Sequence, residues 1–116
     1  MSDIKHIDPG PRISEATIHD GRIYCAGMIP EDTSLDITGQ VKQALAEIDS
    51  LLAKGGSDKT KILSAQIFLP DMKDFAGMNV AWESWVVPGQ TPARATIEAK
   101  LANAAYKVEI MCVAAL

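Results

Sequence analysis

Two charged residues have no obvious partner in the sequence around them. Arg94 follows Pro92 and opens a segment of alternating polar and apolar residues, which is typical of a half-buried strand. Glu109 interrupts an apolar run between Val108 and Ile110, where an unpaired charge is costly. The guanidinium of Arg94 has no acidic residue beside it in the sequence, and its planar donors fit a carboxylate. We therefore expect its partner to be an anion from outside the chain.

Structural explanations for both residues stay open. Arg94 could be a surface or ion-paired arginine, and Glu109 could pair with a lysine across a hairpin or face water at a sheet edge. The segments 93–101 and 106–115 are most simply an antiparallel hairpin. With closure around residues 103–104, Arg94 would lie ~13 Å along the sheet from Glu109, at ~3.3 Å per residue. The two side chains then serve separate purposes or meet one ligand across a subunit contact.

The elements that must position these residues follow the order β-β-β-α-β-α-β-β. A short strand precedes the Pro9–Arg12 segment, and Asp20-Gly21 predicts a tight hairpin turn between the next two strands. Apolar spacing predicts a helix from residue 37 to a Gly55-Gly56 end, and residues 61–70 are typical of a strand. A second helix follows Asp71. We interpret its stripe as core against a sheet; the stripe comprises Phe75, Met78, Trp82 and Trp85.

The helix-strand-helix centre predicts crossovers that place both helices on one face of a single sheet. The strands, however, carry apolar residues on both faces. In the last strand, one series is Val108, Ile110 and Cys112, and the other is Met111, Val113 and Ala115. In the strand at 61–70, we expect Leu63, Ala65, Ile67 and Leu69 to oppose Ile62 and Phe68. Two helices cover only one side, so the other side predicts association with copies of the same chain.

Composition narrows the class of protein. The 116 residues are 47% hydrophobic and 22% charged, which is ordinary for one globular domain spanning 1–116. Fifteen acidic against eleven basic residues give a net charge of −4, and the bases are scattered. This balance argues against nucleic acid as a partner, because counterion release needs a basic face.

The sequence predicts neither a membrane-spanning segment nor a metal site. No apolar run reaches the length of a membrane span and the N-terminus lacks a secretory pattern, so we predict a cytoplasmic protein. Neither His6 nor His19 belongs to a pair with the spacing of metal ligands, so the sequence predicts no metal and no cofactor. Cys25 and Cys112 each lie in an apolar run; buried free thiols are favoured over a structural disulfide.

The segments PGPR with ATIHDGRIYCAGMIP, DFAGMNVAWESWV and TPARATIEAKLANAAYKVEI resemble the RidA/YjgF family of 2-iminoacid and enamine deaminases. The second helix and the YKVEI segment are most similar to YoaB-type members. The likeness covers nearly the whole chain, and its most specific part is Arg94 followed fifteen residues later by Glu109.

The resemblance implies an α+β, chorismate-mutase-like fold, assembled as a homotrimer whose sheets form a central barrel with clefts between subunits. It implies that Arg94 binds the substrate carboxylate, that Glu109 positions the hydrolytic water, and that Gly27 and Thr96 line the pocket. Three positions depart from the family pattern: Arg12 replaces a common tyrosine, Ala26 a common serine, and Thr96 a common cysteine. Asn79 also matches a family position, and we interpret it as a packing residue.

Three functions follow from this comparison. The leading one is hydrolysis of 2-imino and enamino acids to 2-oxo acids and ammonia. The second is a non-catalytic trimeric module that binds small carboxylates, since Arg12 could favour a more anionic ligand or only stiffen an interface. The third, RNA cleavage with translation inhibition, is often attached to the family by name, but the acidic charge balance argues against it.

Overall fold

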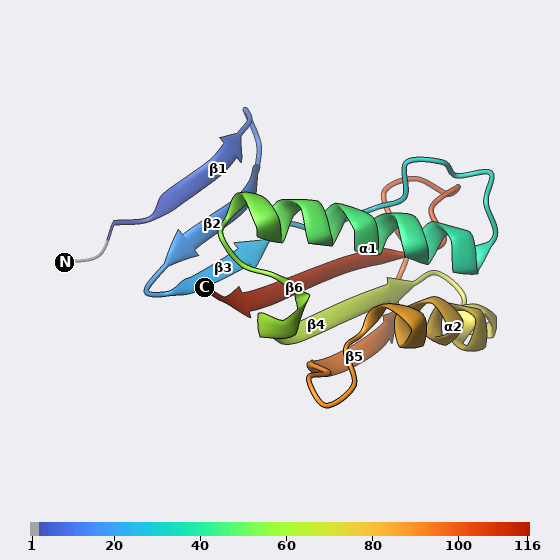
Figure 1. The fold of residues 1–116 in the computed structure, drawn as a ribbon. Coiled ribbons are helices and arrows are strands. Elements are labelled where there is room, and N and C mark those ends of the chain that lie inside the picture. Colours follow the sequence, from blue (N-terminus) through green and yellow to red (C-terminus); the bar gives the residue numbers. More distant parts are fainter. Residues whose placement is uncertain (1–2) are drawn as a thin grey trace.

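A computed structural model describes residues 3–116 as one six-stranded sheet with two helices (Figure 1). The strands are β1 (Lys5–Pro9), β2 (Ser14–His19), β3 (Arg22–Cys25), β4 (Ile62–Leu69), β5 (Ala93–Glu98) and β6 (Glu109–Ala115). The helices are α1 (Ile37–Lys54) and α2 (Phe75–Trp85), with short 3-10 turns η1 (Lys59–Lys61) and η2 (Met72–Asp74). This order confirms the predicted β-β-β-α-β-α-β-β sequence of elements.

The helix ends follow from local chemistry. Asp36 caps α1 by accepting a hydrogen bond from the backbone of Gly39 at 2.9 Å, and Gly56, at φ +82°, takes the left-handed conformation just past its end. The β2–β3 turn places Asp20 and Gly21 at φ 49° and 75°, as the type I′ prediction requires. Asp71 caps η2 rather than α2 directly, because the chain makes a 3-10 turn first.

The predicted hairpin of the last two strands is wrong. The strand order is β1-β2-β3-β6-β4-β5, so β6 lies between β3 and β4, and β5 pairs in parallel with β4 at the edge. The physical reason is burial. The most apolar strand takes the centre of the sheet, where Val108, Ile110 and Ala114 are fully buried. The more polar β5 goes to the edge, and residues 99–108 are long enough to cross between them.

The core lies between the sheet and the helices. Its residues from β4 and β6 are Ala65, Ile67, Leu69, Ile110, Cys112 and Ala114, which pack with the buried stripe of α1. One expected face is corrected here. A bulge between Ile62 and Ser64 shifts the register, so Ile62 joins the buried side and Leu63 is 47% exposed. The opposite side of the sheet carries Phe68, Met111 and Val113, and neither helix covers it.

No helix within residues 3–116 combines the length and the apolar character that a bilayer crossing requires. Cys25 and Cys112 are buried free thiols, as expected. They also contact each other across β3 and β6, which their distance in the sequence did not indicate. Their mutual hydrogen bond, together with burial, raises the pKa of Cys112 well above its ordinary value. The same hydrogen bond lowers the pKa of Cys25, and because both side chains are almost fully buried, both thiols act as core residues.

Candidate functional site

The polar face of β5 lies under α2. Arg94 pairs with Ala65 and Thr96 with Ile67, both of which belong to the buried, helix-covered face of β4. The apolar residues of β5 therefore point to the uncovered side, where Ile97 is 42% exposed. The alternation was predicted correctly, but its orientation is the reverse of an ordinary half-buried strand. An edge strand with its apolar row in solvent fits a surface that another chain covers.

Arg94 is held by residues of α2. Its Nη1 donates a 2.8 Å hydrogen bond to Oδ1 of Asn79 and makes a longer 3.8 Å contact with the sulfur of Met78. Its Cζ lies 5.2 Å from the ring centroid of Trp82 and 5.9 Å from that of Phe75, which are cation–π distances. The guanidinium is thus fixed by an amide and two aromatic faces.

No carboxylate of residues 3–116 lies within ion-pair distance of Arg94. Neither the ion-paired nor the freely solvated alternative therefore describes this arginine. Its Nε and Nη2 donate no hydrogen bond within the described residues. Those two nitrogens form one edge of the guanidinium, and such an edge can bind a carboxylate with two parallel hydrogen bonds.

One further polar group lies on the same face of β5 as this arginine. The Oγ1 of Thr96 is buried and has no hydrogen-bond partner among the described residues. A buried hydroxyl without a partner is costly, so the position can accept a polar ligand atom. On the opposite, uncovered face of the same two strands, a hollow of about 270 Å³ is lined by Ala93, Ala95 and Gln66. It lies behind the backbone of Arg94 rather than beside its guanidinium.

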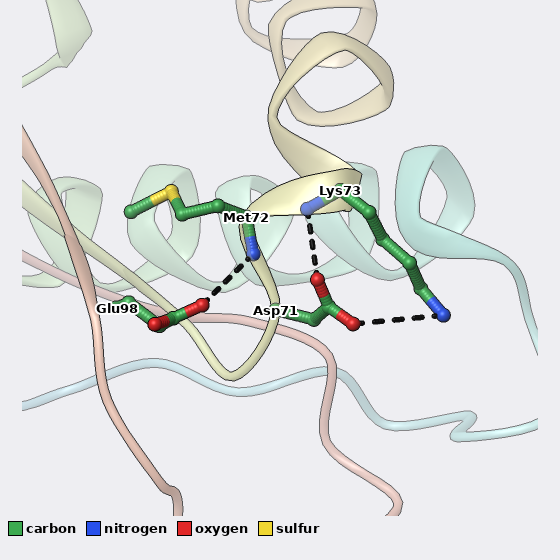
Figure 2. Close-up of polar contacts among 4 residues, drawn as sticks. All are labelled: Asp71, Met72, Lys73 and Glu98. Carbon is green, nitrogen blue, oxygen red and sulfur yellow. Dashed lines mark hydrogen bonds and ion pairs between the residues drawn. The ribbon is translucent and has the colours of Figure 1, made fainter.

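Glu98 connects the same face of β5 to the start of the aromatic helix. Its Oε1 accepts a 3.2 Å hydrogen bond from the backbone N–H of Met72 in η2. Figure 2 shows this contact beside the cap of Asp71, whose carboxylate accepts from the backbone of Lys73 at 2.9 Å and lies 3.7 Å from its Nζ. The turn that leads into α2 is therefore tied to β5, four residues from Arg94.

Glu109 lies on the other side of the sheet. It pairs with Phe68, so its side chain is on the face that the helices leave uncovered. It is half-buried and makes no ion pair within residues 3–116, and β6 is central. Neither the lysine pair nor the edge position expected as an alternative is present. Arg94 and Glu109 therefore do not meet in one chain, as predicted, although opposite faces rather than hairpin register separate them.

Gly27 lies directly against the side chain of Glu109. A Cβ on Gly27 would come closer to Oε2 of Glu109 than real contacts allow, so a larger residue there would require the carboxylate to move. The neighbouring Met28 is locked by two backbone hydrogen bonds with Ile110, of 2.7 and 2.9 Å. Ala26 and Gly27 also border a depression of about 330 Å³. The sequence-predicted residues Ala26, Gly27 and Glu109 are thus brought together, apart from Arg94 and Thr96.

Arg12 joins neither group. It is exposed in the connection between β1 and β2, and the sheet order places that edge farthest from β5.

The resemblance did not assign the residues that hold Arg94 to the site: Asn79 was interpreted as packing, and Phe75 and Trp82 as core. Only Trp82 and Met78 are buried, whereas Phe75 is 41% exposed. The sequence carried one signal for the contact with Arg94. Asn79 is a polar residue at helical spacing between Phe75 and Trp82, on the side of the helix that faces β5.

The fold and the matched residues define the class. Residues 4–116 match the family model described as Endoribonuclease L-PSP, and the chain belongs to this family, also known as RidA/YjgF. Among particular relatives, the chain is 51% identical to a RutC family protein of Haemophilus influenzae, covering 96% of this chain and 97% of that protein. It is 48% identical to RutC family protein YoaB of Escherichia coli K12, covering 97% and 98%.

A solved structure of a family member has the same fold. The crystal structure of NMB1025, a YjgF family member from Neisseria meningitidis, superposes with a TM-score of 0.95 at 45% identity, covering 97% of this chain and 94% of that chain. This agreement confirms the expected α+β fold with both helices on one face of the sheet.

Proposed function

We propose that this chain hydrolyses 2-imino and enamino acids to 2-oxo acids and ammonia, in clefts between copies of a homotrimer. The observation that carries the proposal is Arg94: a guanidinium fixed by Asn79, Phe75 and Trp82, without an internal carboxylate and with its Nε–Nη2 edge available. A 2-imino acid supplies the missing carboxylate. Its C=N carbon is then held at a fixed distance from the anchor, and orientation of this kind lowers the barrier.

The water-activating group comes from a second copy. Arg94 and Glu109 lie on opposite faces of one sheet, and the face of Glu109 carries the exposed Ile97 of β5 and the half-buried Met111 and Val113 of β6. Packing of another chain on that face would bury this surface and bring a Glu109 toward a neighbouring Arg94. Gly27, Ala26 and Thr96 would line the shared cleft. Arg12, at the far edge of the sheet, would reach a cleft only from a neighbouring copy.

The reaction balances without a cofactor. Glu109 accepts a proton from water as the oxygen attacks the carbon of the protonated imine, which gives a carbinolamine. The same carboxyl returns the proton to the nitrogen. As the C–N bond breaks, the hydroxyl proton passes through the carboxylate to the departing ammonia, and the products are a 2-oxo acid and ammonium. An enamine such as 2-aminoacrylate first tautomerises to the imine.

A binding-only module is the second candidate. The groups that hold Arg94 are complete within one chain, whereas the groups around Glu109 are separate from them. Carboxylate binding therefore needs fewer conditions than turnover does. RNA cleavage, the activity in the family model's description, has less support because the chain carries a net charge of −4.

The test generates imines in situ with an amino-acid oxidase and follows semicarbazone formation or 2-oxo acid release. Wild type should accelerate loss of the imine, whereas Arg94→Ala and Glu109→Gln should not, and Arg94→Lys serves as the charge-matched control. If wild type is inert but binds 2-oxo acids in an Arg94-dependent way, the binding module is correct. RNA affinity that falls steeply with added salt would favour the third function.

A further inference from the structure

The group that orients Arg94 is uncharged. Among residues 3–116, the one strong hydrogen bond of the guanidinium is the 2.8 Å contact from Nη1 to Oδ1 of Asn79. Carboxylates are elsewhere: Glu98, on the same face of β5, is four residues along the strand and accepts from Met72, and Glu83, one turn beyond Asn79 on α2, is exposed. Neither forms an ion pair with Arg94. The rings of Phe75 and Trp82 attract the cation without neutralising it.

An aspartate at position 79 would have nearly the same shape as Asn79 and could accept the same hydrogen bond. It would differ in charge. A carboxylate at 2.8 Å from Nη1 would form an ion pair with the half-buried guanidinium and satisfy the charge that a ligand would otherwise meet. The choice of amide over carboxylate therefore bears on binding rather than on the shape of the fold.

We propose that Asn79 is a positioning residue that also sets the charge of the binding site. Its amide oxygen orients Arg94 through Nη1, and its neutrality keeps the positive charge available for a monocarboxylate at the Nε–Nη2 edge. This inference rests on the proposed function only in taking Arg94 as the carboxylate anchor. It assigns specificity for an anionic group to a pair of residues, one on β5 and one on α2.

The test compares Asn79→Asp with Asn79→Leu, which has a similar volume but neither the charge nor the acceptor. Affinity for 2-oxobutanoate is measured by titration calorimetry at neutral pH, with Arg94→Ala defining binding outside the site, and Tm is measured without ligand. For Asn79→Asp we expect affinity to fall about tenfold or more while Tm stays equal to that of wild type or rises. For Asn79→Leu we expect Tm to fall and affinity to drop only about threefold.

The opposite movement of affinity and Tm in Asn79→Asp is the informative result, since a purely structural residue would move both in the same direction. The inference is overturned if Asn79→Asp binds 2-oxobutanoate as wild type does, if its Tm falls as far as that of Asn79→Leu, or if wild type shows no Arg94-dependent binding. Wild type that binds 2-oxobutanoate but hydrolyses no imine removes the proposed function and leaves the inference standing. If wild type hydrolyses imines and Asn79→Asp has an unchanged KM, the proposed function stands and the inference is wrong.

Discussion

The helices α1 and α2 lie on the same side of one sheet, and they differ in what they bury against it (Figure 1). The buried residues of α1 are Gln40, Val41, Ala44, Leu45, Ile48, Leu51 and Leu52. Those of α2 are Met78, Ala81 and Trp82. Phe75 and Asn79, which are less buried, contact the guanidinium of Arg94. The comparison separates a helix that packs almost wholly into the core from a helix that also holds a cation, which under the proposed function shapes the binding surface.

The largest expected effect comes from a substitution in the buried stripe of α1. Leu45 is 1% exposed in the core, so Leu45→Ala should lower the free energy of unfolding by about 3–5 kcal/mol through lost burial and a residual cavity. Chemical denaturation measures this, and Leu45→Met is the volume-matched control, with a cost below about 1.5 kcal/mol. At a temperature where Leu45→Ala remains folded, its affinity for 2-oxobutanoate should equal that of wild type. Lost affinity would show that α1 also shapes the site.

The second prediction concerns the one polar member of the α1 stripe. Gln40 is fully buried; its Nε2 donates to the carbonyls of Thr33, Leu35 and Ala105, and its Oε1 accepts from the backbone of Lys107 at 2.8 Å. Gln40→Leu should cost about 2–3 kcal/mol, because several backbone groups lose their partners. It should also reduce turnover more than ligand binding, since residues 105–107 lead directly to Glu109.

The matched control for Gln40 is on the same helix. Gln43 accepts a single hydrogen bond, from the backbone of Asp32 at 2.7 Å, in an exposed position. Gln43→Leu should therefore cost about 1 kcal/mol or less and leave turnover unchanged. Equal effects of the two substitutions would show that Gln40 has no special connection to the segment before Glu109.

The third prediction moves to α2. Phe75 is 41% exposed, and its ring lies 5.9 Å from Cζ of Arg94. Phe75→Leu should change the free energy of unfolding by less than about 1 kcal/mol and weaken 2-oxobutanoate binding by about two- to fivefold, because an exposed cation–π contact contributes about 0.5–1 kcal/mol. Phe75→Tyr keeps a ring and should bind normally. Val80→Ala, at a 60% exposed position of the same helix, should change neither quantity.

The same contrast explains what the sequence could and could not predict. The α1 stripe, its Gly55-Gly56 end and the Asp20-Gly21 turn depend on neighbours in the chain, and they were placed correctly. The pairing of β5 with β4 depends on competition between whole strands for the buried centre, and no residue near Arg94 encodes the outcome. A helical stripe containing Phe75 and Trp82 has the same spacing whether it faces an aliphatic core or a guanidinium, so the contact of Asn79 with Arg94 was missed for the same reason.

The candidate site shows the same difference between features that depend on neighbours in the chain and features that depend on the tertiary fold. Arg94 was singled out because a fixed cation had no acidic neighbour in the sequence, and Glu109 because it interrupts an apolar run. The separation of their side chains was expected. Their placement on opposite faces was not, because it requires knowing that three strands lie in the order β6-β4-β5. The close approach of Gly27 to Glu109 is likewise a tertiary contact, and only the resemblance pointed to it.

The smallest expected effect tests how firmly α2 must be tied to β5. Glu98 is exposed and accepts a 3.2 Å hydrogen bond from the backbone of Met72 (Figure 2), so Glu98→Ala should cost about 0.5 kcal/mol or less. Loosening this turn should still weaken 2-oxobutanoate binding by about twofold, because Phe75 begins α2 only three residues after Met72. Glu98→Gln retains an acceptor oxygen and should behave as wild type. If Glu98→Ala and Glu98→Gln bind 2-oxobutanoate equally well, then packing against α1 and the sheet is enough to hold Phe75 and Trp82 beside Arg94. In that case α2 resembles α1 more closely, because its core contacts alone fix its position.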